Sequence, residues 1–453
     1  MAAQSKLLDG ALRCSCHAYE HPWTSSCVNA AAGMILSCVP SALRTYATVY
    51  LLALIARLRL PSVQDLRRTV HSILQSMAFL VTTAYGFSLS VCWLRKLLGR
   101  FYFGTVAFLP TFLTSIAAII IERPARRIPL ALYVANVGSE TLWNMLESRG
   151  LVHSIPNGHV ILLGLSTSAL LFLSRLGLHK TVCKDATFKA LHIILGKEEE
   201  GPLRTPAVTI TQSSRPLNFG TILGYVQLYE RVRSAKHPSC PHKHSCSSYA
   251  LRGGLRPFIG GVGLQVALKL LLNSKKIFKL RMEWRKQIFN RKSLNLGLAL
   301  GSFSLLYKAI SCALRHSFGH DSAAFAIPAG LIGSIGLLQF PNTTVSLYVM
   351  WKALQLLYNW GISEGVLPEV PHFTIFLYAL FTSILFHAAI LEPLSLRPSY
   401  YKFLMNVSGN RISRFDVRPF ESFGLNSHAQ VMETIRKLKI DMTSANPMFP
   451  LTT

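Results

Sequence analysis

YFGTVAFLPTFLTSIAAIII, residues 102–121, contains no charged side chain. A stretch of this length can cross about 30 Å of bilayer hydrocarbon as an α-helix. Nine other mainly apolar stretches occur along the chain, so the sequence predicts an all-α polytopic transmembrane protein with about nine to ten apolar segments. The other stretches lie at 41–57, 71–94, 128–147, 158–175, 255–272, 294–314, 322–340, 343–360 and 372–391.

The composition agrees with a membrane protein. Of 453 residues, 50% are hydrophobic and 15% are charged, and the formal net charge is +27. Soluble proteins carry about 25% charged residues. The positive charge lies in loops between apolar runs, where anionic headgroups and the positive-inside effect explain it better than nucleic acid does. We therefore expect the lipid bilayer and anionic lipids as partners, and no nucleic acid.

An internal repeat runs through the apolar segments. Cys92-Trp-Leu-Arg95 resembles Cys312-Ala-Leu-Arg315 at an offset of 220. The pattern predicts two four-helix repeats, at about 71–175 and 294–391. At an offset of 215, identical residues recur for Leu132, Tyr133, Val134, Leu142, Asn144, Ser148, Gly150 and Pro156.

Polar segments divide the chain into regions. Lys and Arg concentrate in one long loop and in the tail, which predicts nine crossings with the loop and the C-terminus in the cytosol. We expect the tail to be soluble or partly disordered. The predicted regions are a Cys/His-containing segment (1–40), a first membrane region (41–175), a basic polar loop (176–254), a non-crossing or re-entrant segment with a basic stretch (255–293), the second repeat (294–391) and a polar tail (392–453).

Three charged residues fall inside predicted membrane segments, where charge is costly and often functional. They are Glu140, Lys308 and Lys352. One interpretation is that Glu140 pairs with Lys352 or Lys308 between the repeats, where transporters place their sites. The alternative is that these helices are partly interfacial and the charges reach water.

Cysteine and histidine gather in two places. Zinc takes both ligand types, so zinc is a candidate cofactor, although neither spacing is typical of a zinc finger. A disulfide, such as one between Cys16 and Cys27, and the absence of any special role are the alternatives. The N-terminal motif comprises Cys16, His21, Trp23 and Cys27, and the loop motif comprises Cys240, His242, His244 and Cys246.

No catalytic motif is present in the sequence. Phosphate-binding glycine loops, nucleophile elbows and metalloprotease patterns do not occur, so we expect no enzymatic activity and assign no catalytic residue. Small residues at four-residue spacing, such as Gly297 and Gly301, predict close helix packing. The same faces could also form the seam of a homo-oligomer.

Several strings resemble the transmembrane protein 135 family, in the right order over roughly 14–404. The most specific string is 396–404, which contains the signature Arg397, Pro398, Ser399 and Tyr400. The other matching residues are Cys16, His21, Trp23, Ser26 and Cys27, then Ile121 to Arg123, Tyr133 to Asn136, Glu140 to Leu142, Gly196 to Glu199, Leu300 to Phe303, Tyr307, Lys308, Ser311, Cys312 and Arg315.

The resemblance implies a protein of peroxisomal and mitochondrial membranes that takes part in lipid metabolism and mitochondrial fission. Three molecular roles remain open. The protein could move a lipid or metabolite, or it could be a scaffold that recruits cytosolic fission or peroxisomal import machinery through its basic loop. Deletion of 200–245 should impair only the scaffold. The third role is a membrane-embedded lipid enzyme that uses the Cys/His groups.

Overall fold

The computed structural model confirms the all-α fold. Within the part of the chain that it describes, the regular elements are helices, and the only pairing of β type is an isolated bridge between Leu12 and Phe101. Residue contacts divide the chain into two units, unit 1 (Met1–Ser154 and Val370–Thr453) and unit 2 (Ile155–Glu369). The described residues are 11–55, 61–178, 185–201, 238–243, 245–279 and 293–440.

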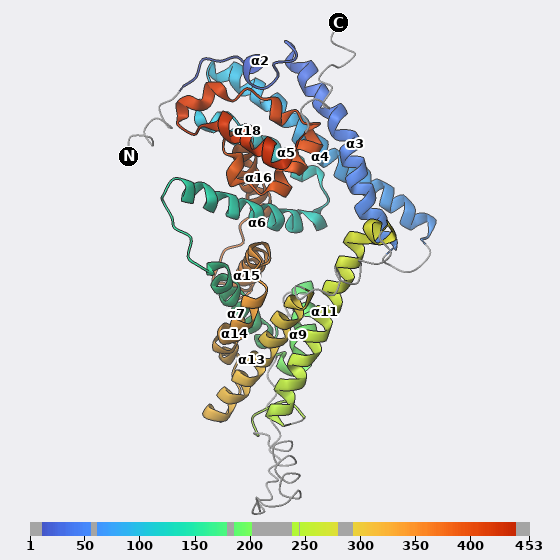
Figure 1. Ribbon diagram of the computed structural model, residues 1–453, viewed down its shortest axis with the longest axis vertical. Helices are drawn as coiled ribbons and strands as arrows, with labels where there is room; N and C mark the ends of the chain where they lie inside the picture. Colours follow the sequence, from blue (N-terminus) through green and yellow to red (C-terminus); the bar gives the residue numbers. More distant parts are fainter. Residues whose placement is uncertain are drawn as a thin grey trace, which may run out of the picture. The chain divides into compact units, whose positions relative to one another are not determined.

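Unit 1 combines the first helices of the chain with the last ones (Figure 1). In it α3 packs along α4, and α16 packs against both α5 and α6. Its elements are α2 (Cys16–Tyr19), α3 (Cys27–Ile55), α4 (Val63–Leu98), η1 (Phe103–Thr105), α5 (Phe108–Ile121), α6 (Pro124–Ser148), α16 (Phe373–Leu391), η6 (Pro393–Ser395), α17 (Pro398–Ser408), η7 (Ile412–Arg414), η8 (Arg418–Phe423) and α18 (Ser427–Leu438).

Unit 2 is built from the middle of the chain. Here α11 packs along α13, and α7 packs against both α14 and α15. Its elements are α7 (Gly158–Leu176), α9 (Ala186–Leu195), η2 (Lys197–Glu199), α11 (Cys246–Lys279), α13 (Asn295–Phe318), η4 (Ala323–Phe325), α14 (Ala326–Gly333), η5 (Ser334–Gln339) and α15 (Thr343–Ser363).

The two predicted repeats exchange their fourth helix. The helix α7 closes the first repeat in sequence, yet it packs in unit 2 with helices of the second repeat. Conversely, α16 closes the second repeat and packs in unit 1. Each unit therefore joins three helices of one repeat to the fourth helix of the other. Both exchanged helices begin after a residue in the left-handed region, Asn157 (φ 57°) and His372 (φ 60°).

Local sequence signals explain where the equivalent helices α4 and α13 end. Each stops at a glycine in the left-handed conformation, Gly99 (φ 69°) and Gly319 (φ 71°). Glycine adopts this conformation without the cost that a Cβ atom adds. The Gly99 N–H donates to the Arg95 carbonyl, and the Gly319 N–H donates to the Arg315 carbonyl. The spacing from arginine to glycine is thus the same in both repeats.

The helices α11 and α13 pack with their backbones nearly in contact. A Cβ atom on Gly297 would lie 2.6 Å from the Phe258 carbonyl oxygen, and one on Gly261 would lie 2.8 Å from the Gly297 Cα atom. A Cβ atom on Gly301 would lie 3.0 Å from the Gly254 carbonyl oxygen. The predicted small-residue packing is therefore confirmed as contact within one chain.

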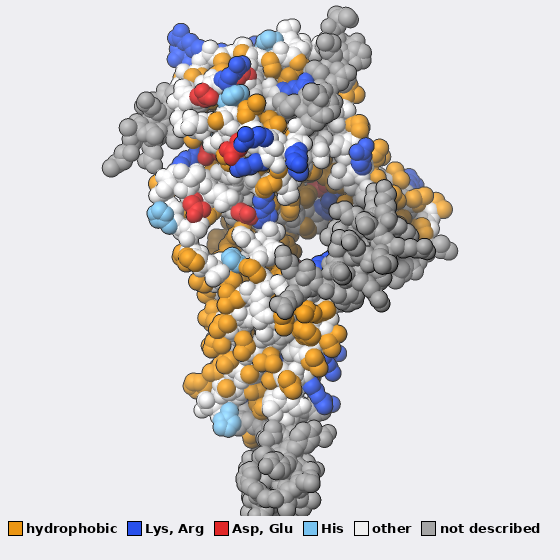
Figure 2. Space-filling model, viewed as in Figure 1, with side chains coloured by type: hydrophobic (Ala, Val, Ile, Leu, Met, Phe, Trp, Pro, Cys, Tyr) orange, Lys and Arg blue, Asp and Glu red, His pale blue; other side chains and the backbone are white. Residues whose placement is uncertain are grey.

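Six helices of the described chain are long and apolar enough to cross a membrane: α3, α4, the stretch Phe103–Ile121, α7, α13 and α16. Within the described residues, each of the ten predicted segments falls on helical elements. The predicted segment 255–272 lies inside α11, which continues through it as one helix; its non-crossing or re-entrant position in a membrane stays a prediction. Hydrophobic side chains cover much of the visible face of the unit 2 helices in Figure 2. The exposed hydrophobic residues of this unit include Ile161, Leu165 and Leu298.

The predicted polar tail is, up to residue 440, a folded part of unit 1. Apolar side chains from it are fully buried, among them Tyr401, Phe420 and Phe423. The Phe420 ring makes an edge-to-face contact with Tyr19, whose ring centroid lies 4.7 Å away. The expectation of disorder was wrong for this part, because a few widely spaced aromatic residues supply the buried contacts that order it.

Candidate functional site: two Cys/His clusters

The first cluster, called the N-terminal cluster, comprises Cys16, His21, Cys27 and Cys92. Its thiol and imidazole atoms all lie within 4.8 Å of one another. The Cys16 and Cys27 Sγ atoms are 3.5 Å apart, and the Cys92 Sγ atom is 3.5 Å from His21 Nε2. Cys16 begins the short helix α2, His21 follows that helix, Cys27 begins α3, and Cys92 comes from the last turns of α4.

A backbone hydrogen bond sets the orientation of the His21 ring. Nδ1 lies 2.7 Å from the Thr24 carbonyl oxygen, which can only accept, so Nδ1–H is the donor. A neutral imidazole then has its lone pair on Nε2, and this atom faces Cys92. The ring is fully buried. The arrangement is the one in which a histidine is ready to bind a metal ion.

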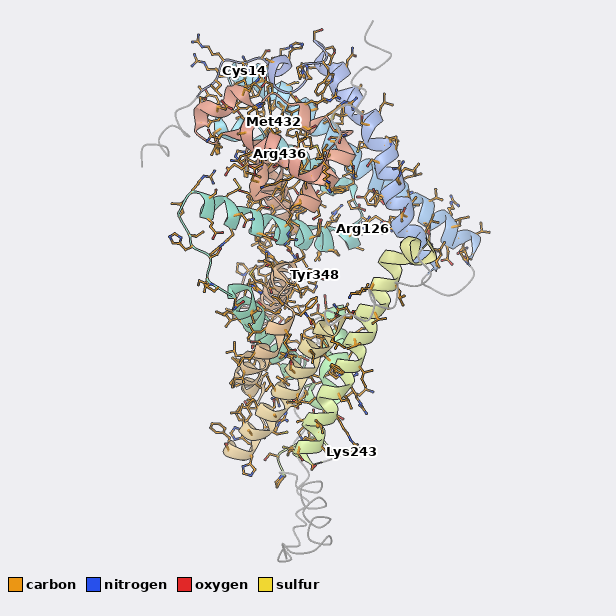
Figure 3. All side chains as sticks on the ribbon, in the orientation of Figure 1. Cys14, Arg126, Lys243, Tyr348, Met432 and Arg436 are labelled. Carbon is orange, nitrogen blue, oxygen red and sulfur yellow. The ribbon has the colours of Figure 1, made fainter. Side chains whose placement is uncertain are left out.

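The second cluster, called the loop cluster, comprises Cys240, His242, Cys246 and Cys312. Its donor atoms also lie within 4.8 Å of one another. The Cys240 and Cys246 Sγ atoms are 3.8 Å apart, and Cys312 Sγ is 3.4 Å from His242 Nε2. The His242 ring is stacked on Tyr249, with centroids 4.3 Å apart. Figure 3 shows Lys243, the neighbour of His242, beside the first turn of α11.

The two clusters occupy equivalent positions. Cys27 and Cys246 are the first residues of α3 and α11, and Cys92 and Cys312 lie six residues before the ends of α4 and α13. Sequence reasoning missed Cys92 and Cys312 as members, although the repeated Cys-x-Leu-Arg string was the signal that pointed to them.

Two residues of the predicted motifs, Trp23 and His244, are not among the cluster members. Trp23 lies in the turn between His21 and α3, where its side chain is half-buried, and it offers no donor of the thiol, imidazole or carboxylate type to the cluster. His244 lies outside the residues that the structure describes.

One thiol of each cluster has a pKa above its usual value. Burial raises the pKa of Cys16, and the hydrogen bond with Cys246, together with burial, raises the pKa of Cys240 to about 11. Burial also raises the pKa of the neighbouring Glu20 carboxyl to about 8. Nucleophilic chemistry needs the thiolate, so these surroundings do not resemble a reactive cysteine site.

Comparison with known proteins concerns the part of the chain that holds the N-terminal cluster. Residues 13–146 match the family model described as the N-terminal cysteine-rich region of Transmembrane protein 135. This region of the chain is similar to the Transmembrane protein 135 family. All four residues of the N-terminal cluster lie within the match. No solved structure matches the chain.

The family signature that the sequence suggested lies at the start of α17. Arg397 precedes the helix, and its guanidinium binds the Glu140 carboxylate and donates to Asn136 Oδ1 at 3.0 Å. Pro398 is the first residue of α17, and Pro398 and Ser399 are exposed. Tyr400 is buried and lines an apolar cavity of about 100 Å³ between α3, α4, α6, α16 and α17. The signature therefore ties α17 to α6.

The predicted pairs between Glu140 and a membrane lysine were wrong. Glu140 pairs with Arg397 in unit 1. In unit 2, Lys352 Nζ lies 2.6 Å from Asp185 Oδ2, and Lys308 Nζ lies 4.4 Å from the centre of the Tyr249 ring. Sequence reasoning missed these partners because Arg397 and Asp185 lie in segments taken as polar and outside the membrane.

A buried network centred on charged residues joins η2, α7, α11 and α13 of unit 2. Glu199 accepts hydrogen bonds from Arg315 NH1 at 3.1 Å and NH2 at 2.8 Å, and from the Tyr249 hydroxyl at 3.1 Å. Asp321 accepts from Arg315 Nε at 3.0 Å and pairs with Arg175. Two cations thus face two carboxylates, and the network neutralises itself.

A basic pocket of about 460 Å³ lies beside the loop cluster in unit 2. Its charged lining consists of Lys197, Arg252, Arg256 and Lys308, with Glu198 as the single acidic side chain. The remaining lining residues are His192, Ile193, Ile194, Leu195, Gly196, Tyr249 and Gly253. The lining therefore combines net positive charge with an apolar wall.

Proposed function

We propose that this protein is a non-enzymatic integral membrane protein of peroxisomal and mitochondrial membranes that binds and moves anionic lipid. Through that activity it contributes to lipid metabolism and to organelle dynamics, including mitochondrial fission. The apolar helices and the family support the membrane location. The resemblance along the chain supports the two organelles, and the basic pocket of unit 2 carries the lipid part of the proposal.

The pocket suits a molecule with an anionic head and an apolar chain. Arg252 and Arg256 are four residues apart on α11, so their side chains lie on one face of the helix. Leu251, Leu255 and Ile259 follow the neighbouring face at the same spacing, and all three are exposed. A phosphate head in the pocket would meet positive charge while an acyl chain lies along the leucines and Ile259.

Lipid binding by the purified protein tests the proposal. In detergent, binding of a fluorescent anionic phospholipid is compared with binding of a zwitterionic one. We expect preference for the anionic lipid, and we expect Arg252→Gln/Arg256→Gln to weaken that binding about 5- to 30-fold, because each Lys or Arg near a lipid surface contributes about 1 kcal/mol. Equal binding by the wild type and this variant would contradict the proposal.

A matched control removes the same charge elsewhere. Arg67→Gln/Arg68→Gln takes two exposed arginines from the start of α4 in unit 1, and we expect it to bind anionic lipid as the wild type does. Imaging of a C-terminally tagged protein, after permeabilisation of the plasma membrane alone, tests the location. Label on peroxisomes and mitochondria is the expected result, and label confined to other membranes would contradict the proposal.

The scaffold alternative requires a deletion smaller than 200–245, because that range includes Cys240 and His242. Deletion of 203–236, which lies outside the described residues, spares both. If the protein moves lipid, the deletion variant should keep both its lipid binding and its effect on organelle shape. If the protein is a scaffold, the variant should still bind lipid but no longer affect organelle shape. Activity that persists after Cys240, His242, His244 and Cys246 are all changed to Ala would remove the enzyme alternative.

A further inference from the structure

We propose that each of the two Cys/His clusters binds one zinc ion through three cysteine thiolates and one histidine. The N-terminal cluster supplies Cys16, His21, Cys27 and Cys92, and the loop cluster supplies Cys240, His242, Cys246 and Cys312. On binding, the three thiols of each cluster release their protons to solvent, and the neutral imidazole binds through Nε2. The chain thus carries two structural zinc sites.

The distances within each cluster fit a tetrahedral zinc ion. Zinc lies about 2.3 Å from a thiolate sulfur and about 2.0–2.1 Å from an imidazole nitrogen, so two sulfurs should be about 3.8 Å apart and a sulfur and a nitrogen about 3.6 Å apart. Cys16 and Cys27 have their sulfurs 3.5 Å apart, Cys240 and Cys246 have theirs 3.8 Å apart, and all donor atoms of each cluster lie within 4.8 Å of one another. The observed sulfur–nitrogen distances are 3.5 and 3.4 Å.

The surroundings of the donors also match a metal site. Metal-bound histidines usually donate their other ring N–H to a carbonyl or carboxylate, which orients the ring. His21 does this through Nδ1 and the Thr24 carbonyl. In the loop cluster, the stacked Tyr249 ring covers one face of His242. Both imidazoles are almost completely buried, at 0 and 1% exposure, so solvent does not compete for Nε2.

The recurrence of the same donor set in both units is the strongest support. The spacing is Cys-x4-His-x5-Cys in the N-terminal cluster and Cys-x-His-x3-Cys in the loop cluster. In each cluster, therefore, a loop of different length brings three donors to the start of one helix, α3 or α11. The fourth donor is a cysteine near the end of the helix packed along it, α4 or α13. A disulfide would use only two of the four donors and would leave the histidine and the helix cysteine unexplained.

Metal analysis of the full-length protein, purified in detergent without chelator, tests the proposal. Elemental mass spectrometry should find two zinc ions per chain. Cys92→Ser and Cys312→Ser should each halve the zinc content, and the double variant should lose nearly all of it. The controls are Cys38→Ala, a buried cysteine of α3, and Cys14→Ser, a half-buried neighbour; both lie outside the clusters and should retain two ions.

A second measurement on the unchanged sequence keeps the test independent of how the variants fold. After exchange of zinc for Co²⁺, thiolate-to-cobalt charge-transfer absorption should appear at two equivalents per chain. Zinc-free wild-type protein that gains no such absorption would overturn the proposal. Iron in place of zinc would overturn it too, as would mass-spectrometric detection of a Cys16–Cys27 or Cys240–Cys246 disulfide in most of the protein.

Discussion

Removal of the Glu199 charge should strongly destabilise unit 2. In Glu199→Gln the side chain keeps nearly the same shape, but Arg315 and Arg175 then face only the Asp321 carboxylate. Arg315 is 0% exposed, so water cannot compensate the extra positive charge. Loss of one partner from a buried ion pair costs about 3–5 kcal/mol. For a unit of this size, that corresponds to a fall in Tm of roughly 6–20 °C.

Thermal unfolding of the purified protein in detergent measures the effect. Glu198→Gln is the matched control, because Glu198 is adjacent and exposed, and we expect it to change stability by less than about 0.5 kcal/mol. The double variant Glu199→Gln/Arg315→Met should lose less than the sum of the two single variants, since neither charge is left alone. A Tm for Glu199→Gln equal to that of the control would refute the reasoning.

The same carboxylate makes a distinct contribution to the pH dependence of stability. Burial by itself would raise the pKa of Glu199, but the charge and hydrogen bonds of Arg315, the charge of Arg175 and the hydrogen bond from Tyr249 outweigh burial, so the pKa is lowered. A lowered folded-state pKa means that the stabilisation is present above the unfolded-state value, about 4.3, and is lost as the pH falls through the folded-state value. The acid side of the stability profile should therefore be flatter in Glu199→Gln than in the wild type.

Two further predictions concern packing and the family signature. Gly297→Leu should destabilise the contact of α13 with α11 by at least about 1–3 kcal/mol, because its Cβ atom would lie 2.6 Å from the Phe258 carbonyl oxygen. The control is Gly263→Leu, whose Cβ atom would meet no atom within 4 Å and which should not destabilise the contact. The Tm values of the two variants are compared. Arg397→Met should lower the Tm by removing the ion pair with Glu140, and Arg397→Lys should restore part of the loss; equal effects of Met and Lys would contradict a role for the charge.

Sequence patterns alone determined the helices and the repeat. Apolar stretches of bilayer length and glycines such as Gly297 are signals that lie within one segment of the sequence. The shared Cys-x-Leu-Arg string is found by comparing two segments of the sequence, without any knowledge of contacts. The same holds for the N-terminal motif, where three of the four predicted residues belong to the cluster. For that reason the fold class and the position of both motifs could be predicted before any contact was known.

Only the tertiary structure decided which residues meet. Cys92 joins Cys16 from more than seventy positions away, and Arg397 joins Glu140 from 257 positions away. The exchange of α7 and α16 between the units depends on which helical faces pack together. The hydrophobic pattern of a helix shows that it has an apolar face, but it does not identify the helix that packs against that face. The donor sets of both clusters, and the charge network around Arg315, exist only because of that packing.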